Sequence, residues 1–227
     1  MRVRMLTWLA IGSFVLLIPA TAGALPITIS GGTAGTIPGG AGVNDFIPTL
    51  FPGATISGFY GSTIDFSVAA TSTLTLDFFG GEADFSDEFD YLGVQRFAHT
   101  AGTLISPNLS SPLGTFTTTI NGSGVLSFVF DAHSDASHVA NGSNPNNAAH
   151  NQLGPNFFAS CNPFSATPQP TNCDTVYLFL DDSGGGPDVD YDDMLVRARI
   201  QAVPEPATLV LIGLGLFAGS LAVRRRN

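Results

Sequence analysis

The sequence predicts a mainly β fold, an antiparallel β-sandwich or jelly roll, between two apolar chain ends. Short runs of β-branched and aromatic residues alternate with segments rich in Gly, Pro, Ser, Thr and Asn, as in antiparallel sheets. No stretch of residues 25–202 places apolar residues at helical spacing for three turns. This outer domain is long enough to bury one core of its own.

The strand-like runs alternate with turn signals along the outer domain. Between two of them, Asn121 and Gly122 tolerate the positive φ of a tight turn, which predicts a hairpin. Leu126, Phe128 and Phe130 alternate with smaller residues, so we expect them to face the core. The predicted strands are residues 63–69, 72–79, 114–120, 124–130, 175–180 and 194–202.

Residues 1–24 have the three parts of a secretory signal peptide. Arg2 and Arg4 precede an apolar run at residues 5–18, and small residues lead up to Leu25. The run is too short to span a bilayer, so we expect a signal helix that signal peptidase removes before Leu25.

The second apolar segment, residues 207–223, contains no charged residue. As a helix it would measure about 26 Å, which suffices to cross the inner membrane. Arg224, Arg225 and Arg226 follow at once and hold that end in the cytoplasm. We therefore expect a transmembrane helix that leaves the domain at 25–202 on the outer side.

Pro204, Glu205 and Pro206 stand immediately before this helix. The two prolines cannot join a helix in register, so they hold an extended segment where a protease can bind it. With the apolar helix and the arginines, residues 203–227 resemble the PEP-CTERM sorting signal of Gram-negative bacteria, also called the ice-binding protein C-terminal domain. The resemblance implies that an exosortase, a membrane-embedded cysteine protease, recognises these three residues and releases the mature domain to the cell surface or matrix.

The charge balance of the outer domain excludes one class of partner. Residues 25–203 hold 17 acidic residues against three arginines, and the whole chain has no lysine. Such a surface cannot neutralise a run of phosphates, so nucleic acid is not an expected partner. Docking of the domain on anionic lipid is disfavoured for the same reason.

The two cysteines, Cys161 and Cys173, both fall in the exported part of the chain. Disulfides form and persist in such an oxidising compartment, and we expect one to close this loop. Two cysteines alone do not make a zinc site.

The acidic segment between the last two predicted strands holds six aspartates in thirteen residues. Crowded carboxylates repel, and a hard cation with six to eight oxygen ligands relieves that repulsion. Calcium is the candidate, and a solvated acidic turn is the alternative; Arg197 and Arg199 are other possible partners for these side chains. The candidate ligands are Asp181, Asp182, Asp188, Asp190, Asp192 and Asp193.

Two further polar clusters allow other chemistry or none. The Asp and His residues of segment 131–138 suit a transition metal or a solvated loop. The second cluster suits the carboxylate pair of a glycosidase, or acidic loops without catalysis. It consists of Glu82, Asp84, Asp87, Glu88 and Asp90.

No hydrolase or phosphate-binding motif occurs in the chain, and we assign no catalytic residue. The expected function is that of a non-enzymatic exported surface or matrix protein associated with exopolysaccharide. A carbohydrate- or ice-binding module, which needs a flat Thr-rich or aromatic face, is one alternative, with Thr117, Thr118 and Thr119 as its hint. A secreted hydrolase is the other.

Overall fold

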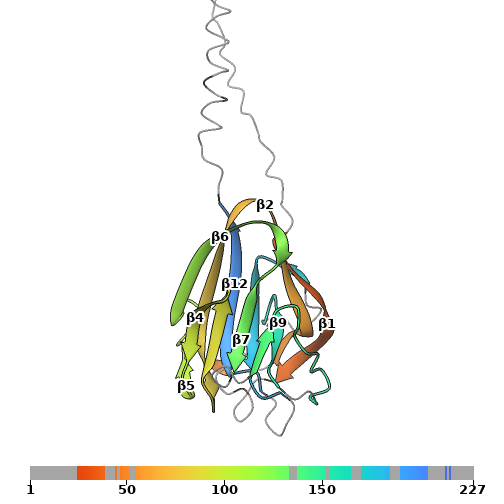
Figure 1. Cartoon of the computed structure of the whole chain (residues 1–227), viewed down its shortest axis with the longest axis vertical. Coiled ribbons are helices and arrows are strands. Elements are labelled where there is room, and N and C mark those ends of the chain that lie inside the picture. Colours follow the sequence, from red (N-terminus) through yellow and green to blue (C-terminus); the bar gives the residue numbers. More distant parts are fainter. Residues whose placement is uncertain are drawn as a thin grey trace, which may run out of the picture.

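Antiparallel strands make up most of the residues described in this computed structural model, which confirms the mainly β prediction (Figure 1). The signal segment 1–24 and the segment 207–223, apart from residues 213 and 215, lie outside the described residues. Among the residues described, none belongs to a helix that is both long and apolar enough for a membrane crossing. The structure describes residues 25–38, 44, 47–51, 55–132, 137–151, 154–164, 170–184, 190–203, 213 and 215.

The larger sheet has the strand order β10-β1-β2-β12-β11-β9, and β5 and β6 also pair with β2. Its central strand β12 is the last strand among the described residues and lies between β2 and β11. The strands are β1 (Ile27–Pro38), β2 (Thr55–Ala83), β5 (Gly102–Ile105), β6 (Gly114–Val125), β9 (Asn156–Ser160), β10 (Asn172–Cys173), β11 (Thr175–Asp181) and β12 (Met194–Ala202).

The smaller sheet has the order β4-β3-β7-β8 and is also antiparallel. Its strands are β3 (Asp87–Tyr91), β4 (Val94–His99), β7 (Phe128–Ala132) and β8 (Ser137–Ala140). A single short helix, α1 (Ile47–Leu50), completes the described elements.

Strand β2 replaces the two separate strands expected at 63–69 and 72–79. It runs unbroken beside β6 from Asp65 to Phe78, with an irregularity in the register between Val68 and Ser72. Figure 1 shows β2 and β6 arching together over one end of the domain at this point. The predicted hairpin at Gly122 is wrong: its φ is positive, at 73°, but it serves the bend of this ribbon, opposite Val68.

The two sheets share one core, because each contributes apolar side chains to the space between them. Leu126, Phe128 and Phe130 are buried there, as the alternation predicted. The ring of Phe128 lies 5.4 Å from that of Phe157 in β9, so the sheets are in direct contact. A second apolar cluster, around Tyr60, Phe158 and other residues, covers a different part of the large sheet.

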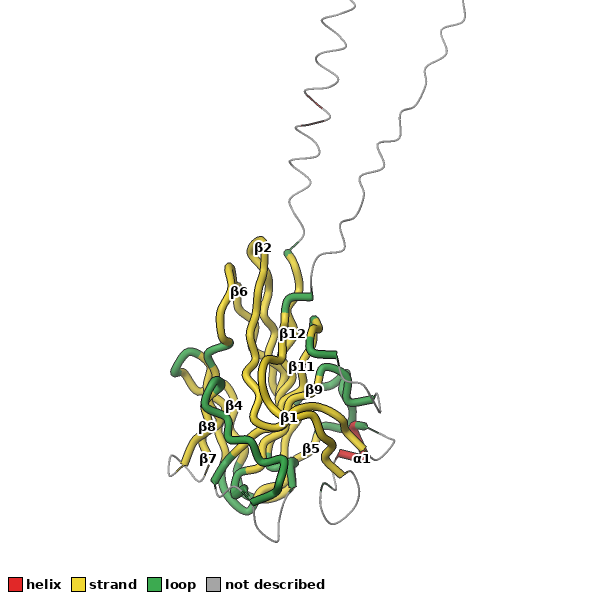
Figure 2. The backbone as a smooth tube through the Cα atoms, turned by 90° about the vertical axis from the view of Figure 1, so that its right-hand side faces the viewer, coloured by secondary structure: helices red, strands yellow, loops and turns green. Residues whose placement is uncertain are grey.

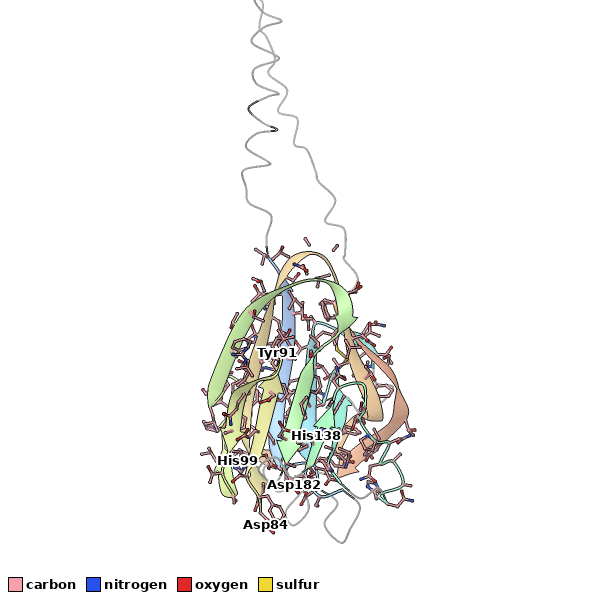
Figure 3. All side chains as sticks on the ribbon, viewed as in Figure 1. Asp84, Tyr91, His99, His138 and Asp182 are labelled. Carbon is pink, nitrogen blue, oxygen red and sulfur yellow. A yellow bond between two sulfur atoms is a disulfide. The ribbon has the colours of Figure 1, made fainter. Side chains whose placement is uncertain are left out.

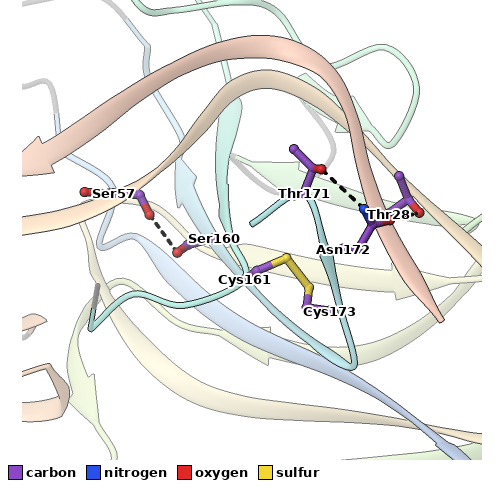
Figure 4. The surroundings of a disulfide bond; sticks show 7 residues. All are labelled: Thr28, Ser57, Ser160, Cys161, Thr171, Asn172 and Cys173. Atoms are coloured by element: carbon purple, nitrogen blue, oxygen red, sulfur yellow. Dashed lines mark hydrogen bonds between the residues drawn. A yellow bond between two sulfur atoms is a disulfide. The ribbon is translucent and has the colours of Figure 1, made fainter. Parts of the chain in front are cut away.

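The predicted disulfide between Cys161 and Cys173 is present (Figure 4). It joins the end of β9 to β10, whose two residues pair with β1. Next to it, the Ser160 hydroxyl donates to the carbonyl of Ser57 at 2.7 Å. The bridge therefore fastens a very short strand to the body of the sheet.

Both ends of the described domain adjoin the bend of β2. Ile27 in β1 pairs with Phe66, and Ala202 in β12 pairs with Ser72. Figure 2 shows that this bend forms one extremity of the domain. Figure 3 shows Asp182, Asp84 and His99 toward the opposite extremity of the domain.

Candidate metal centre

The pairing of β11 with β12 brings the two ends of the acidic segment together. The register runs from Thr175 opposite Arg199 to Leu180 opposite Met194. Asp181 and Asp182 therefore leave the sheet directly beside the point where Asp193 enters it. Of the predicted ligands, Asp188 lies outside the described residues.

The described carboxylates of this segment are buried or half-buried, which does not fit an exposed acidic turn. The backbone of the segment is pinned in place: the amide of Glu82 donates to the carbonyl of Asp192 at 2.7 Å. Asp190 is half-buried. The exposed fractions are 0% for Asp181, 4% for Asp182, 3% for Asp192 and 5% for Asp193.

Tyr191 anchors the acidic segment in the second apolar cluster. Its side chain is fully buried, with its ring 5.7 Å from that of Tyr60. Its hydroxyl donates to Asn156, and its amide donates to Asn44 at 2.7 Å. Because an aromatic ring in a packed core has little freedom, it fixes the positions of the aspartates on either side.

Asp181 is buried but well satisfied. One carboxylate oxygen accepts from the Gly184 amide at 2.6 Å, and the other accepts from the Asn156 side chain at 3.2 Å. Burial is the main cause that raises its pKa to about 7, and the Asp182 charge adds to the increase, whereas the hydrogen bonds oppose it. Asp193 accepts from the Asp182 amide at 2.7 Å, and burial with three neighbouring acids raises its pKa well above its usual value.

Asp87 belongs in the sequence to the acidic cluster at residues 82–90, not to the acidic segment between β11 and β12. It begins β3 on the same side of the strand as Phe89 and Tyr91, with an exposed fraction of 0%. Neither of its carboxylate oxygens has a hydrogen-bond partner among the residues that the structure describes. Burial, with a further contribution from Asp182, raises its pKa to about 8.

Asp87 meets the acidic hairpin at its base. Ligand oxygens of Asp87, Asp182 and Asp193 lie within 4.8 Å of one another, and those of Asp181, Asp190 and Asp193 form a second such group. Five aspartates from two sheets thus converge around Asp193. The structure unites four of the six predicted ligands, Asp181, Asp182, Asp190 and Asp193, and adds Asp87, whereas Asp192 belongs to neither group.

Two glycines of β2 allow it to pass close to its neighbours, Gly81 to the hairpin and Gly80 to β5. A Cβ atom on Gly81 would lie only 1.8 Å from the carbonyl oxygen of Asp193, and one on Gly80 would lie 1.7 Å from that of Leu104. Gly80 also has a φ of 100°, a conformation that side chains disfavour. Only glycine fits where β2 passes so close to both neighbours.

Arg197 and Arg199 do not pair with the hairpin aspartates. Both contact the buried carboxylate of Asp77 in β2, at 2.8 Å and 2.9 Å. The register places Asp77 directly opposite Arg197, so the two side chains share one face of the sheet. Among the described residues, the acid that these arginines pair with is therefore Asp77 of the neighbouring strand and not an aspartate of the hairpin.

Apart from Asp87, no described residue of the other two clusters belongs to a group of metal-type ligands. In segment 131–138, residues 133–136 lie outside the described residues, and the exposed His138 belongs to neither group of metal-type ligands. In the cluster proposed for a glycosidase, Asp87 faces the core, whereas Glu88 and Asp90 alternate to the opposite side of β3. The sequence did indicate that Asp87 is buried, because it alternates with polar residues in the same way as Phe89 and Tyr91 and so falls on the apolar side of the strand.

The tail after β12 supplies the comparison with known proteins. The family model of the PEP-CTERM protein-sorting motif matches residues 202–226. The chain carries a PEP-CTERM sorting signal. Such a tail marks an exported protein whose transit is membrane-anchored and which an exosortase sorts, in Gram-negative bacteria. Pro204, Glu205 and Pro206, with Arg224, Arg225 and Arg226, fall within this match but outside the described residues.

No curated protein and no solved structure matches the chain. The PEP-CTERM match therefore concerns the sorting of the protein, and the outer domain has to be interpreted from its own residues.

Proposed function

We propose that the chain is a non-enzymatic surface or matrix protein, released from the inner membrane by an exosortase and associated with exopolysaccharide. One observation carries this proposal: the domain is complete where the sorting signal starts. Strand β12 ends at Ala202, paired with Ser72, and the PEP-CTERM match begins at residue 202. Cleavage near Glu205 would thus release the sheet without removing any of its strands.

The arrangement of the domain supports a non-catalytic role. The acids that suggested a glycosidase include Asp87, which is fully buried and has no access to a polymer. A surface hollow near the chain ends is lined by small and apolar residues such as Leu25, Val68 and Ile200, with no titratable side chain. Glycoside hydrolysis requires two carboxyl groups that face a substrate.

A polar sheet face supports the association with exopolysaccharide. Thr117 and Thr119 of β6 are exposed, and the register sets them opposite Thr75 and Thr73 of β2. Cross-strand partners point to the same face, so four hydroxyl groups form two adjacent pairs there. Hydroxyl groups both donate and accept hydrogen bonds, as sugars require. This face also favours a carbohydrate-binding module as the second candidate function.

Mass spectrometry of the protein from its native host tests the sorting. We expect the mature chain to start at Leu25 and to end near Glu205, and the variant Pro204→Ala with Pro206→Ala to keep its C-terminus. Pro107→Ala, an exposed proline within the domain, serves as the control and should be processed normally. A wild-type protein that retains residues 207–227 on the cell surface would contradict exosortase release.

Co-sedimentation with the exopolysaccharide of the host tests the polymer association. We expect the wild-type protein to sediment with it and Thr117→Ala with Thr119→Ala to sediment at least about threefold less. The exposed Thr103→Ala on β5 is the matched control. Equal sedimentation of all three proteins would remove this face from the proposal, and no sedimentation would remove the association itself.

A further inference from the structure

Asp87 occupies a position where a carboxyl group is costly. It shares the inward face of β3 with two aromatic side chains and is fully buried, and within the described part of the chain both of its oxygens lack a hydrogen-bond partner. Burying a charged group without partners is strongly unfavourable, so natural proteins pair such groups or coordinate a metal with them.

Among the described residues, the side chains that approach the Asp87 carboxyl group include two further acids. Asp182 and Asp193 reach it from the β11–β12 hairpin, and both are buried themselves. His99, its pairing partner in β4, is buried too, and this burial lowers its pKa and so favours the neutral ring. Its nitrogens belong to neither group of metal-type ligands.

No basic side chain in the part of the chain that the structure describes can balance these charges. That part contains three arginines, and the protein has no lysine. Arg197 and Arg199 bind Asp77, and Arg96 lies over the ring of Phe116 at 4.0 Å. A bound cation would supply the positive charge that the described side chains do not offer to this cluster.

The ligand atoms select the kind of cation. Both groups consist of carboxylate oxygens alone, which hard cations prefer, whereas zinc favours histidine and cysteine. Calcium holds oxygen at 2.3 to 2.6 Å, so two ligands on opposite sides of one ion lie about 4.8 Å apart. The oxygens of Asp87, Asp182 and Asp193 meet that limit.

We propose that Asp87, Asp182 and Asp193 bind one calcium ion, which fastens β3 of the small sheet to the hairpin of the large sheet. This site goes beyond the role in sorting, and it does not depend on exosortase processing. Asp87 is its decisive residue because it comes from the other sheet and accepts no hydrogen bond from any described residue. Tyr191 acts as a positioning residue, since it fixes the loop that leads into Asp193.

Calorimetric titration of the full-length chain, purified in detergent and freed of metal, tests the site with calcium chloride alone. We expect one ion per chain with a Kd of about 1 mM or below. Calcium at a hundredfold excess over Kd should raise the Tm in circular dichroism by about 5 to 10 °C.

The variant Asp87→Asn distinguishes a calcium site from a carboxyl group that is simply buried and protonated. We expect it to weaken calcium binding at least about tenfold, while its Tm without metal equals or exceeds that of the wild type, because it removes a repelling charge. This second measurement shows that the variant folds. Asp84→Asn removes a charge from an exposed position between β2 and β3 and should bind calcium like the wild type.

Two outcomes would overturn the proposal. The first is a wild-type chain whose Tm and titration do not respond to 10 mM calcium, which would mean that the carboxyl groups remain protonated. The second is Asp87→Asn that binds calcium as tightly as the wild type, which would place any ion on the hairpin alone.

Discussion

The pairing of two arginines with one buried acid makes a sharp prediction about stability. Asp77 is 1% exposed, and Arg197 reaches it through Nε at 3.1 Å and through NH2 at 2.8 Å, with 11% of its side chain exposed. Arg199 contacts the same oxygen but is 36% exposed. Water screens Arg199 far more than Arg197, so the two contacts differ in their contribution to stability.

The variant Asp77→Asn keeps the shape of the side chain but leaves Arg197 buried without a counter-charge. Breaking a buried pair in this way costs about 3 to 5 kcal/mol of unfolding free energy. For a domain of this size, that cost corresponds to a fall in Tm of about 6 to 20 °C. Arg199→Met should cost about 0 to 1 kcal/mol of unfolding free energy, or less than about 4 °C in Tm, because water reaches the Arg199 side chain and screens its contact.

Thermal unfolding of both variants, followed by circular dichroism in one buffer, measures the difference. The double variant Asp77→Leu with Arg197→Met should recover most of the loss, since two apolar side chains replace the buried pair, and the Arg199 that loses its partner is partly exposed to water. If Asp77→Asn and Arg199→Met lowered the Tm equally, burial would not control the strength of these contacts, and the argument would fail.

Three further predictions concern the disulfide, the close approach of β2 and the buried acids. Cys161→Ser with Cys173→Ser should cost about 2 to 3 kcal/mol, measured by urea unfolding, and an unchanged midpoint would show that the loop needs no bridge. Gly81→Ala should lower both the Tm and calcium binding, because its Cβ would lie 1.8 Å from the carbonyl oxygen of Asp193; unaffected binding would contradict that placement. In metal-free buffer, the urea concentration at the unfolding midpoint should fall as the pH is raised from 5.5 to 8. Burial raises the pKa of Asp87 to about 8, so the folded protein has to lose a proton from a buried group over this range, which destabilises it. A midpoint that rose with pH would refute this sign.

Local patterns in the sequence predicted the strands that pair with their neighbours in the chain. Residues 175–180 and 194–202 agree closely with β11 and β12, because β-branched and aromatic runs bounded by acids and glycines are unambiguous. The turn at Gly122 was misplaced because positive φ serves a bend as well as a hairpin. Whether a glycine with positive φ closes a hairpin or bends a strand depends on its partner strand. Here the partner is β2, in which Val68 lies opposite Gly122.

The candidate site was predicted in part for the same reason. Asp181, Asp182, Asp190 and Asp193 stand close together in the sequence, so their crowding was visible. Asp87 is remote in the chain, and only the packing of the small sheet on the large one brings it to the hairpin. The packing of one sheet on another leaves no local pattern in the sequence. The one indication is an acidic residue at a position where the alternation of the strand predicts an apolar one.

The position of β12 restricts when this domain can assemble. The last strand before the sorting signal stands in the middle of the large sheet, with β2 on one side and β11 on the other. A chain that crosses the membrane from its N-terminus therefore cannot complete the sheet until Met194–Ala202 has emerged. Folding then comes after translocation, while the segment that follows still holds the newly arrived strand near the bilayer. A protease that cut a few residues too early would split the sheet through its centre instead of trimming an edge.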